Sequence, residues 1–402
     1  MLRPMLDFSE EQKAIQTAVR TWCQRELEPK VPALEAGTES VYPLMRAMGQ
    51  TFGIADLARS SFAQAGESPT TTRSASARAS GPLTAIVMME LSRVCPGFAM
   101  AFGASIGLFG GAVMARGTPE QRQRWALPVM TLEKIGAWGL TEPGAGSDAF
   151  GSMKTRARRD GSGFRLTGSK TFITNAPFAD VMLVYARLDG SEGNAPEVRA
   201  FLVDRTDAGV SVGPPMKKMG MHASPTGEIF LDDVALPEDR LLGGTTQAGD
   251  ARSAAKSSLQ GERFGMTPMC LGIVDRCLEE SIRYAKERTQ WGKPIATFQL
   301  IQEKIARIYQ ARTLIMTLLL RQLEAEGKGV PLAMAEASAS KLYCARVTTE
   351  CALEAVQLMG GAGYMSGSVV EMLARDAKLF QIGGGTDEIQ ILRIARELLE
   401  GR

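Results

Sequence analysis

The stretch that decides the fold is Gly139-Leu140-Thr141-Glu142-Pro143-Gly144-Ala145-Gly146-Ser147-Asp148. It stands where the hydrophobic pattern changes from a helical repeat to short alternating runs. Pro143 and the glycines indicate a turn, and the hydroxyls of Thr141 and Ser147 can form hydrogen bonds with a ligand. Gly144 and Gly146 lack side chains, so the backbone can approach that ligand closely. The stretch therefore predicts a β domain that begins with a binding loop.

Residues 1–134 contain a series of helical patterns and are predicted to form an all-helical N-terminal domain. Ser9-x-x-Gln12 is a capping box before an amphipathic helix, and Thr118-Pro119 is typical of a helix N-terminus. Further helical patterns cover residues 40–58, 82–95, 98–116 and 119–131. The segment Ala65–Gly81 contains no large apolar residue, and we expect it to be a mobile loop.

Residues 135–245 are predicted to form a central β domain, and residues 246–402 a four-helix bundle. Alternating runs at 164–167, 181–185, 201–203 and 229–231 predict the strands. After a linker at 243–258, helical patterns cover residues 259–289, 297–326, 331–359 and 367–400. Breaks rich in glycine and proline separate these helices, which is typical of a bundle.

The composition excludes several classes of function. The 402-residue chain is 45% hydrophobic with a net charge of +2, and it has no long run of like charge that would bind nucleic acid. We find no signal peptide and no window that approaches the roughly 20 apolar residues of a membrane span, so a cytoplasmic location is expected. Six cysteines without a C-x-x-C pair predict reduced, mostly buried thiols.

The single histidine, His222, excludes a zinc site built on two histidines, and we expect no metal. A Ser-His-Asp hydrolase would have to use His222 alone. Gly103–Gly107 matches the G-x-S-x-G nucleophile motif, but it lies in an apolar run that favours a helix without a preceding strand. We expect His222 to be a surface residue without a catalytic role.

Three further segments add to Gly139–Asp148. They are Phe172-Ile173-Thr174-Asn175, Glu287-Arg288-Thr289-Gln290-Trp291-Gly292, and the stretch from Gln357-Leu358-Met359-Gly360-Gly361-Ala362-Gly363-Tyr364 through Arg375-Asp376 to Gly385-Thr386-Asp387-Glu388-Ile389-Gln390. In this order, and over almost the whole chain, they resemble the acyl-CoA dehydrogenase family. The resemblance implies an α+β fold with an N-terminal helical domain, a central β-barrel-like domain and a C-terminal four-helix bundle.

The resemblance also implies an FAD cofactor. The residues that would bind FAD are Leu140, Thr141, Gly146, Ser147, Phe172, Thr174, Arg288, Gln290, Trp291, Gln357, Gly360, Gly361, Thr386 and Glu388. By resemblance Arg288 would reach the FAD pyrophosphate of a neighbouring subunit, with Gln357 and Gly361 on the adenosine side, so a homotetramer is expected. Arg288 alone could instead be an arginine that satisfies carbonyls at a helix C-terminus. Phe172 stands where relatives usually have tryptophan, and His222 where they have arginine.

Family chemistry needs a carboxylate to remove the α-proton of an acyl thioester while a hydride leaves the β-carbon for the flavin. Many relatives carry that carboxylate in an Ile-x-Glu-Gly-Thr stretch, but the stretch here, Ile382–Thr386, has Gly384 at that position. In the isovaleryl-CoA and crotonobetainyl-CoA reductase types, the catalytic glutamate instead comes from the first helix of the bundle, where it stands directly before an arginine. Glu262-Arg263 fits, because Arg263 lies 25 residues before Arg288.

By this resemblance Glu262 is the predicted base, and Arg263 and Ser147 would contact the substrate. The alternative is that Glu262 is a solvated carboxylate in the first turn of a helix. The backbone N–H of Gly384 could polarise the thioester carbonyl. The helix-borne base favours short or branched acyl groups, by resemblance only.

Several alternatives stay open at the level of sequence. The acyl group could be held by a carrier protein instead of CoA, or the enzyme could reduce an enoyl thioester. A flavin-binding module without dehydrogenase activity, or a monooxygenase on the same scaffold, is a different class, and Glu262 argues against both. A dehydrogenase should pass its electrons to an electron-transfer flavoprotein.

Overall fold

The computed structural model describes residues 8–67, 71–189, 197–244, 251–330 and 332–400, with the backbone alone for residues 61, 64–67, 71–80 and 251–264. The described part of the N-terminal region is mostly helical. Its helices are α1 (Glu10–Trp22), η1 (Cys23–Leu27), η2 (Glu28–Lys30), α2 (Val31–Glu35), α3 (Val41–Thr51), α4 (Ile54–Glu67), α5 (Thr71–Val94), α6 (Pro96–Gly103), η3 (Ala104–Gly110), α7 (Gly111–Arg116), α8 (Pro119–Gln121), η4 (Arg122–Ala126) and α9 (Leu127–Met130). The predicted capping box is present at Ser9–Gln12, and the predicted cap Thr118 forms a second one with Gln121.

The described part of the middle region forms a seven-stranded mixed sheet. Its strands are β1 (Gly136–Gly139), β2 (Arg156–Asp160), β3 (Gly163–Thr174), β4 (Val181–Leu188), β5 (Val198–Asp204), β6 (Val210–Val212) and β7 (Thr226–Leu236), with the short helices η5 (Ala176–Phe178) and η6 (Glu238–Arg240). The strand order is β1-β4-β2-β3-β7-β6, and β5 pairs with β4. β1 and β2 are parallel to β4, whereas the other pairs are antiparallel.

Strand β4 is buried on both faces, as its continuous apolar sequence predicts. Val181, Leu183 and Tyr185 enter one core, which they share with Trp125 from the N-terminal helices. Alternate residues of β4 enter a second core, together with Phe201 and other side chains of the curled sheet. The sheet is thus packed on both sides of its central strand.

The C-terminal region is a helical bundle followed by a surface helix. Its elements are α10 (Ala251–Glu287), β8 (Thr289–Gln290), β9 (Lys293–Pro294), η7 (Ile295–Thr297), α11 (Gln299–Lys328), α12 (Met334–Met359), α13 (Gly361–Tyr364), α14 (Val369–Ala377), η8 (Lys378–Gln381) and α15 (Asp387–Glu400). All six cysteines are buried and free, as predicted. The fold class predicted from the sequence is therefore confirmed, while the domain limits at 134 and 245 stay predictions.

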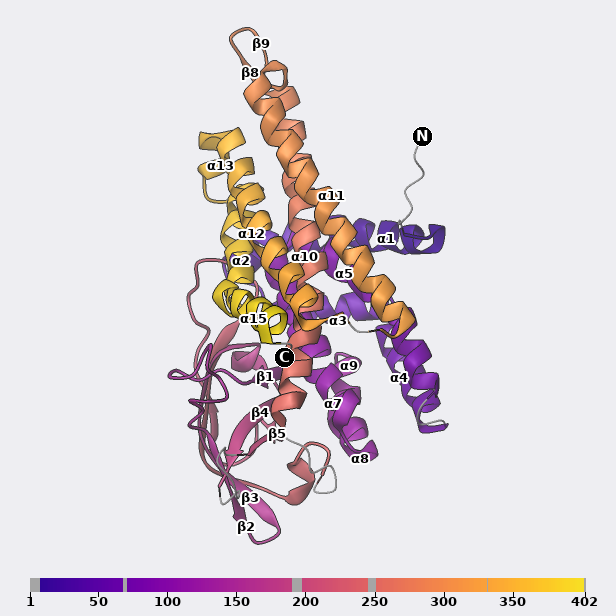
Figure 1. The fold of residues 1–402 in the computed structure, drawn as a ribbon, viewed down its shortest axis with the longest axis vertical. Helices are drawn as coiled ribbons and strands as arrows, with labels where there is room; N and C mark the ends of the chain where they lie inside the picture. Colours follow the sequence, from indigo (N-terminus) through magenta and orange to yellow (C-terminus); the bar gives the residue numbers. More distant parts are fainter. Residues whose placement is uncertain (1–7, 68–70, 190–196, 245–250, 331, 401–402) are drawn as a thin grey trace.

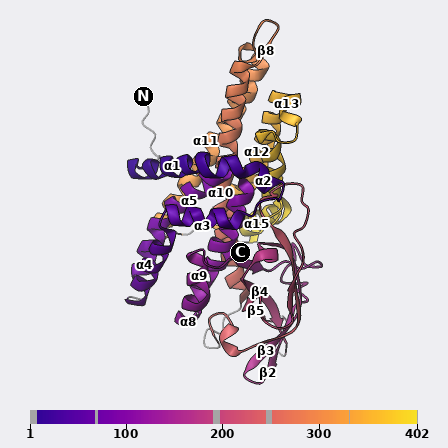
Figure 2. The same cartoon turned by 180° about the vertical axis from the view of Figure 1, so that it is seen from behind.

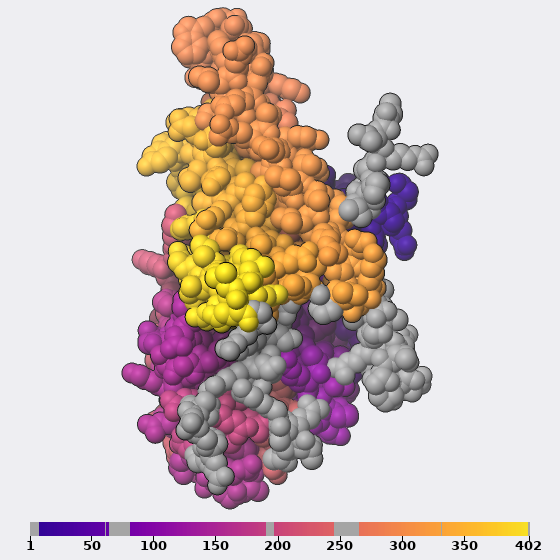
Figure 3. Space-filling model, in the orientation of Figure 1, coloured from indigo at the N-terminus to yellow at the C-terminus, as the bar shows by residue number. Residues whose placement is uncertain are grey.

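The elongated molecule carries its sheet at one end and the β8–β9 hairpin with α13 at the other (Figure 1). Seen from behind, α1, α3 and α4 lie across the back of the bundle (Figure 2). Helix α15 lies on the surface between the bundle and the sheet region (Figure 3). The two ends of the long axis therefore carry different predicted site segments.

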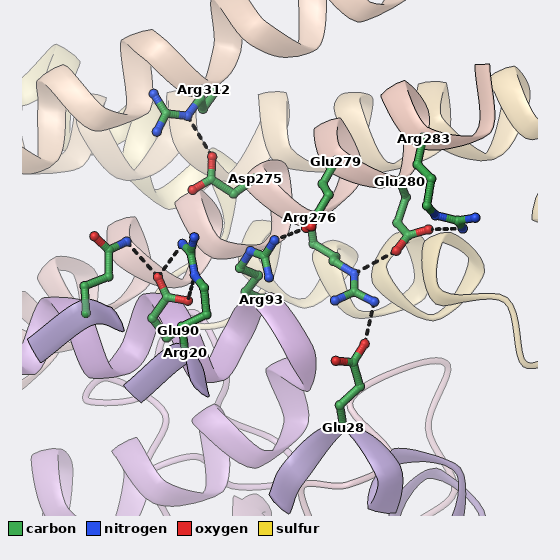
Figure 4. A network of polar contacts seen from close by, with 11 residues as sticks. Arg20, Glu28, Glu90, Arg93, Asp275, Arg276, Glu279, Glu280, Arg283 and Arg312 are labelled. Carbon is green, nitrogen blue, oxygen red and sulfur yellow. Dashed lines mark hydrogen bonds and ion pairs between the residues drawn. The ribbon is translucent and has the colours of Figure 1, made fainter. Parts of the chain in front are cut away.

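Charged side chains join the N-terminal helices to the bundle (Figure 4). Glu90 of α5 is buried and accepts hydrogen bonds of 2.8 Å from Nε and Nη2 of Arg20 on α1. Arg276 of α10 pairs with Glu28 at 2.6 Å and with Glu280 at 3.1 Å. Arg20–Glu90 thus ties α1 to α5, and Arg276–Glu280 lies within α10, whereas Arg276–Glu28 joins the bundle to the N-terminal helices. Because breaking a buried pair leaves an uncompensated charge, these contacts help to fix the packing of the helices.

Four predictions of local structure were wrong. The expected loop Ala65–Gly81 is helical up to Glu67 in α4 and again from Thr71 in α5, because alanine and arginine favour helix even without apolar side chains. Gly53, at positive φ, divides the helix expected at 40–58. The linker expected at 243–258 is helical from Ala251, and a glycine loop interrupts the helix expected at 367–400.

Candidate active site

The loop that follows β1 lies against the last residues of β3. Thr171 N donates a 2.9 Å hydrogen bond to the carbonyl of Thr141, which joins the loop to that strand. Leu140 is buried, whereas Gly146 and Ser147 are exposed. A Cβ added at Gly144 or Gly146 would meet no atom within 4 Å. The structure thus places Leu140, Thr141, Gly146 and Ser147 around an open cradle.

A buried ion pair holds this loop from beneath, and the sequence did not reveal it. Lys170 of β3 is fully buried, and its Nζ lies 2.8 Å from Glu142 Oε1 and 3.1 Å from the carbonyl oxygen of Leu140. Glu142 also accepts backbone hydrogen bonds from Lys154 and Thr155 at 2.6 and 2.9 Å. The only sequence signal is a lysine inside an otherwise apolar strand.

The two charges of this pair support each other. Burial lowers the pKa of Lys170 to about 8, against the opposing effect of Glu142. Burial also opposes ionisation of Glu142, but the Lys170 ammonium and the hydrogen bonds outweigh it and hold the pKa of that carboxyl below its ordinary value. Both groups are therefore charged at neutral pH, and the pair fixes the backbone of Leu140.

Phe172 follows Thr171, the residue of β3 that bonds to the same loop. Its backbone is left-handed, with φ of 57°, at an irregularity in the pairing of β3 with β7 between Lys170 and Ile173. The ring is 68% exposed although it is large and apolar. Strained backbone of this kind persists where the surroundings enforce it, and a bulge redirects a side chain. The half-buried Thr174 ends β3 two residues further on.

The glycine loop that precedes α15 is also held by buried polar groups. Gly384 and Gly385 have φ of 63° and 93°. Lys341 Nζ donates to the carbonyl of Gly385 at 2.8 Å, and Gln390 Nε2 donates to the carbonyls of Gly384 and Gly385 at 3.2 and 2.9 Å. Because Lys341 and Gln390 are almost fully buried, the loop has one well-defined shape. Lys341 was not anticipated from the sequence, and Gln390 was noted only as the end of the Gly385–Gln390 motif.

The residues that follow the glycine loop begin helix α15. The hydroxyl of Thr386 accepts from Ile389 N at 3.4 Å. Glu388 is exposed, and hydrogen bonds from its own backbone amide and Thr386 lower the pKa of its carboxyl. Both side chains thus lie at a helix N-terminus, which favours negative charge.

The other predicted cofactor residues lie at the opposite end of the molecule. Arg288, Gln290 and Trp291 are in or next to the β8–β9 hairpin, and Gln357, Gly360 and Gly361 are where α12 passes into α13 (Figure 1). All six are exposed, Trp291 to 85%. A single chain therefore does not bring them together with Thr141 and Phe172.

A cavity of about 680 Å³ lies between α5, α10, α11 and the continuous stretch α6–η3–α7, within the roughly 300–1,000 Å³ of small-molecule sites. Met266 of α10 lines it and also reaches the glycine loop, because a Cβ at Gly383 would lie 3.7 Å from Met266 Cε. Glu262 and Arg263 precede Met266 on α10, but their side chains are outside the described part of the structure.

The same cavity explains an unexpectedly apolar helix. In the described chain, one stretch, Pro96–Arg116, is long and apolar enough to cross a membrane by length and composition, with mean hydropathy 1.7. The expectation that no window approaches the composition of a membrane span is therefore wrong for this stretch. However, 56% of the window is buried inside the protein, as in the core helix of a soluble protein. One face packs in the core through Phe98 and Phe109, and another lines the cavity through Gly107 and Leu108.

Three family models match consecutive parts of the chain. They are the N-terminal, middle and C-terminal domains of acyl-CoA dehydrogenase, at residues 77–133, 137–234 and 252–399. This chain belongs to the acyl-CoA dehydrogenase family. As a member it is an FAD-dependent oxidoreductase, which confirms the enzyme class and cofactor expected from the sequence.

Individual relatives agree with the family. The chain is 36% identical to the short-chain specific acyl-CoA dehydrogenase of Megasphaera elsdenii, over 78% of this chain and 81% of that protein. It is 33% identical to 3-(aryl)acrylate reductase of Clostridium sporogenes, over 98% and 100%. It is 37% identical to the caffeyl-CoA reductase-Etf complex subunit CarC of Acetobacterium woodii, over 78% and 82%. A glutaryl-CoA dehydrogenase of Mycobacterium smegmatis in complex with FADH2 superimposes with a TM-score of 0.85 at 26% identity, over 98% and 95%.

The residues of this chain fit the family cofactor. The space at Gly144 and Gly146 lets a ligand approach the protein backbone closely. The exposed ring of Phe172 suits contact with a flat ring system. Trp138 of β1 adds a buried indole Nε1 for which no described residue provides an acceptor. These observations support FAD at the end of β1 and β3.

Two other sequence motifs have structural roles. Ser105 of the G-x-S-x-G match is fully buried in η3 and accepts a 3.0 Å hydrogen bond from Gly136 N, so it cannot act as an exposed nucleophile. His222 is partly exposed, with Nδ1 3.3 Å from Glu35 Oε2 and Nε2 2.9 Å from the carbonyl of Lys218. Among the described residues, no cluster of His, Cys, Asp and Glu could hold a metal ion.

Gly385→Ala is expected to destabilise the glycine loop by about 1–3 kcal/mol, because its φ of 93° is strained for any side chain. The added Cβ would also lie 2.8 Å from Gln390 Nε2, whose hydrogen bonds shape the loop. The matched control is Gly383→Ala, for which the nearest atom is at 3.6 Å. Thermal unfolding of both variants checks this. Equal melting temperatures would show that the loop tolerates a different shape.

Proposed function

We propose that this enzyme oxidises the acyl group of an acyl-CoA thioester to a trans-2-enoyl-CoA, with Glu262 as the base. The observation that carries the proposal is the cavity beside α10. Its lining on α10 begins at Gly265, one turn after Glu262, and Met266 of that lining also reaches the glycine loop at Gly383. A thioester with its acyl chain in the cavity would therefore have its reacting carbons near the turn of α10 that carries Glu262 and near the glycine loop.

Each residue then has one task. Glu262 would take the α-proton, and its neighbour Arg263, with Ser147, would position the thioester. The N–H of Gly384 would donate to the thioester carbonyl, which acidifies the α-carbon by stabilising the developing enolate. FAD, when bound, accepts the hydride that leaves the β-carbon. The apolar cavity excludes water from the reacting atoms.

Completion of the cofactor site would require a second subunit. Because Arg288, Gln357 and Gly361 are exposed at the end opposite the cradle, they would bind the FAD of a neighbouring chain. Exposed apolar side chains on α11 and α15, including Tyr309, Leu398 and Leu399, offer surfaces for such contacts. A homotetramer is the assembly we propose.

The electrons would leave through an electron-transfer flavoprotein. A relative is named as a subunit of a reductase-Etf complex, which supports this class of partner. Relatives named as reductases also favour a second possibility, in which the same site reduces an enoyl thioester. The base and the cavity would be the same in both directions.

The test is anaerobic mixing of the purified, FAD-loaded protein with a panel of acyl-CoAs. Bleaching of the flavin absorbance, with formation of the enoyl-CoA, is the expected result. The same acyl groups on a carrier protein form the comparison, and reduction of enoyl-CoAs by the reduced enzyme measures the reverse reaction. A flavin that no thioester bleaches, but that reacts rapidly with oxygen once reduced chemically, would favour a monooxygenase.

A further inference from the structure

The cavity contains polar groups that the proposed reaction does not use. Its lining is mostly apolar and includes Met88, Met100, Met266, Met269, Leu108, Leu319, Leu323 and Leu332. Gln322 and Glu326 of α11 and Arg116 at the end of α7 also line it. Gln322 is buried, Arg116 is partly buried and Glu326 is exposed. Because buried polar atoms in proteins are nearly always paired, the buried atoms of Gln322 and Arg116 require an explanation.

Gln322 is only 4% exposed, and no described residue donates to its Oε1. Nη1 of Arg116 is likewise buried without an acceptor among the described residues. One group is an acceptor and the other a donor, and both belong to side chains that line one cavity. A ligand hydroxyl can donate to the first and accept from the second.

The shape of the cavity favours a chain as the ligand. Gly103, Gly107 and Gly111 line one helical stretch at successive turns, and a Cβ at Gly107 or Gly111 would meet no atom within 4 Å. The eight-residue rise from Gly103 to Gly111 spans about 12 Å along the helix. An extended acyl chain of about ten bonds has the same length. The cavity is therefore longer than the short acyl groups that the sequence resemblance favours.

The chemistry of the lining identifies which part of the substrate enters. A pantetheine arm carries two amides, which a mostly apolar lining would leave without partners, whereas an alkyl chain suits methionine and leucine side chains. A carboxylate on that chain could pair with Arg116, but it would face the carboxyl of Glu326 in the same cavity. A neutral hydroxyl avoids this repulsion.

We propose that the enzyme prefers an acyl group whose tail carries a hydroxyl, and that Gln322 is the residue that recognises it. The proposal rests on the proposed function, since it concerns the acyl part of the same thioester. Gln322 does not take part in the reaction; it binds the tail and thereby sets the selectivity.

The experiment compares octanoyl-CoA, ω-hydroxyoctanoyl-CoA and the mono-CoA thioester of octanedioic acid, with hexanoyl and decanoyl sets beside them. For wild type we expect kcat/KM to be about three- to tenfold higher for a hydroxylated substrate than for the plain one of equal length. In Gln322→Leu this ratio should fall to about one, through a loss of kcat/KM for the hydroxylated substrate. Gln310→Leu, an exposed position on the same helix, is the matched control and should keep the wild-type ratio.

Three results would overturn the proposal. They are a wild-type ratio of one, a preference for the diacid, and a Gln322→Leu variant whose KM rises equally for every thioester, which would place the amide on the common pantetheine arm. Melting temperatures show whether Gln322→Leu folds, and Gln322→Met supplies a second variant without the amide. If no thioester bleaches the flavin, the proposed function itself fails. If plain acyl-CoAs react without any preference for a hydroxyl, only this inference fails.

Discussion

Glu262→Gln should lower kcat by about 10²–10⁴-fold, the usual contribution of a positioned general base, while FAD stays bound. Glutamine keeps the shape of glutamate but cannot accept the α-proton. The position that many relatives use is Gly384, which has no side chain, so no second carboxylate is expected at that point of the loop. Exchange of the α-proton of a bound substrate with solvent should stop as well.

Two measurements make this test specific. Flavin absorbance of the purified variant checks that the cofactor is retained, and exchange of solvent deuterium into a non-reacting acyl-CoA analogue reports the base alone. Glu11→Gln, an exposed glutamate in the first turn of α1, is the control and should behave as wild type. Full activity of Glu262→Gln would mean that Glu262 is a solvated helix carboxylate and that another group removes the proton.

Local sequence signals predicted the larger architecture because each acts within a few residues. The capping boxes, the glycine breaks between helices and the alternating strands all depend on such short-range chemistry. The segment Ala65–Gly81 shows the limit of this reasoning. A lack of apolar side chains indicates that a segment is not buried in a core, but it does not indicate a loop. Alanine and arginine favour a helix even at exposed positions.

The supporting parts of the site could not be predicted because they depend on contacts between distant residues. Lys341 looks like any helical lysine until the fold places it against the carbonyl of Gly385, 44 residues away. Arg288 and Gln357 were found by their motifs, yet in one chain they lie far from the loop at Thr141 (Figure 1). Their partners would belong to another subunit, which the order of residues in one chain does not describe.

Lys170→Met should destabilise the protein by about 3–5 kcal/mol and weaken FAD binding. The substitution keeps an unbranched apolar stem but removes the ammonium, so Glu142 stays buried without its ion-pair partner. The carbonyl of Leu140 loses the same donor. We expect a lower melting temperature and release of flavin on dilution, measured by fluorescence of free FAD.

The double variant Lys170→Met/Glu142→Gln separates the role of the charge from that of the fold. A neutral glutamine can still accept from the N–H groups of Lys154 and Thr155, as Glu142 does, and it leaves no unpaired charge. Replacing both members of a buried ion pair is often far less damaging than removing one, so the double variant should be more stable than Lys170→Met. Such non-additivity is expected for residues in direct contact. If the two substitutions simply add, Lys170 acts by filling space, and the loop at Leu140 is held by its backbone alone.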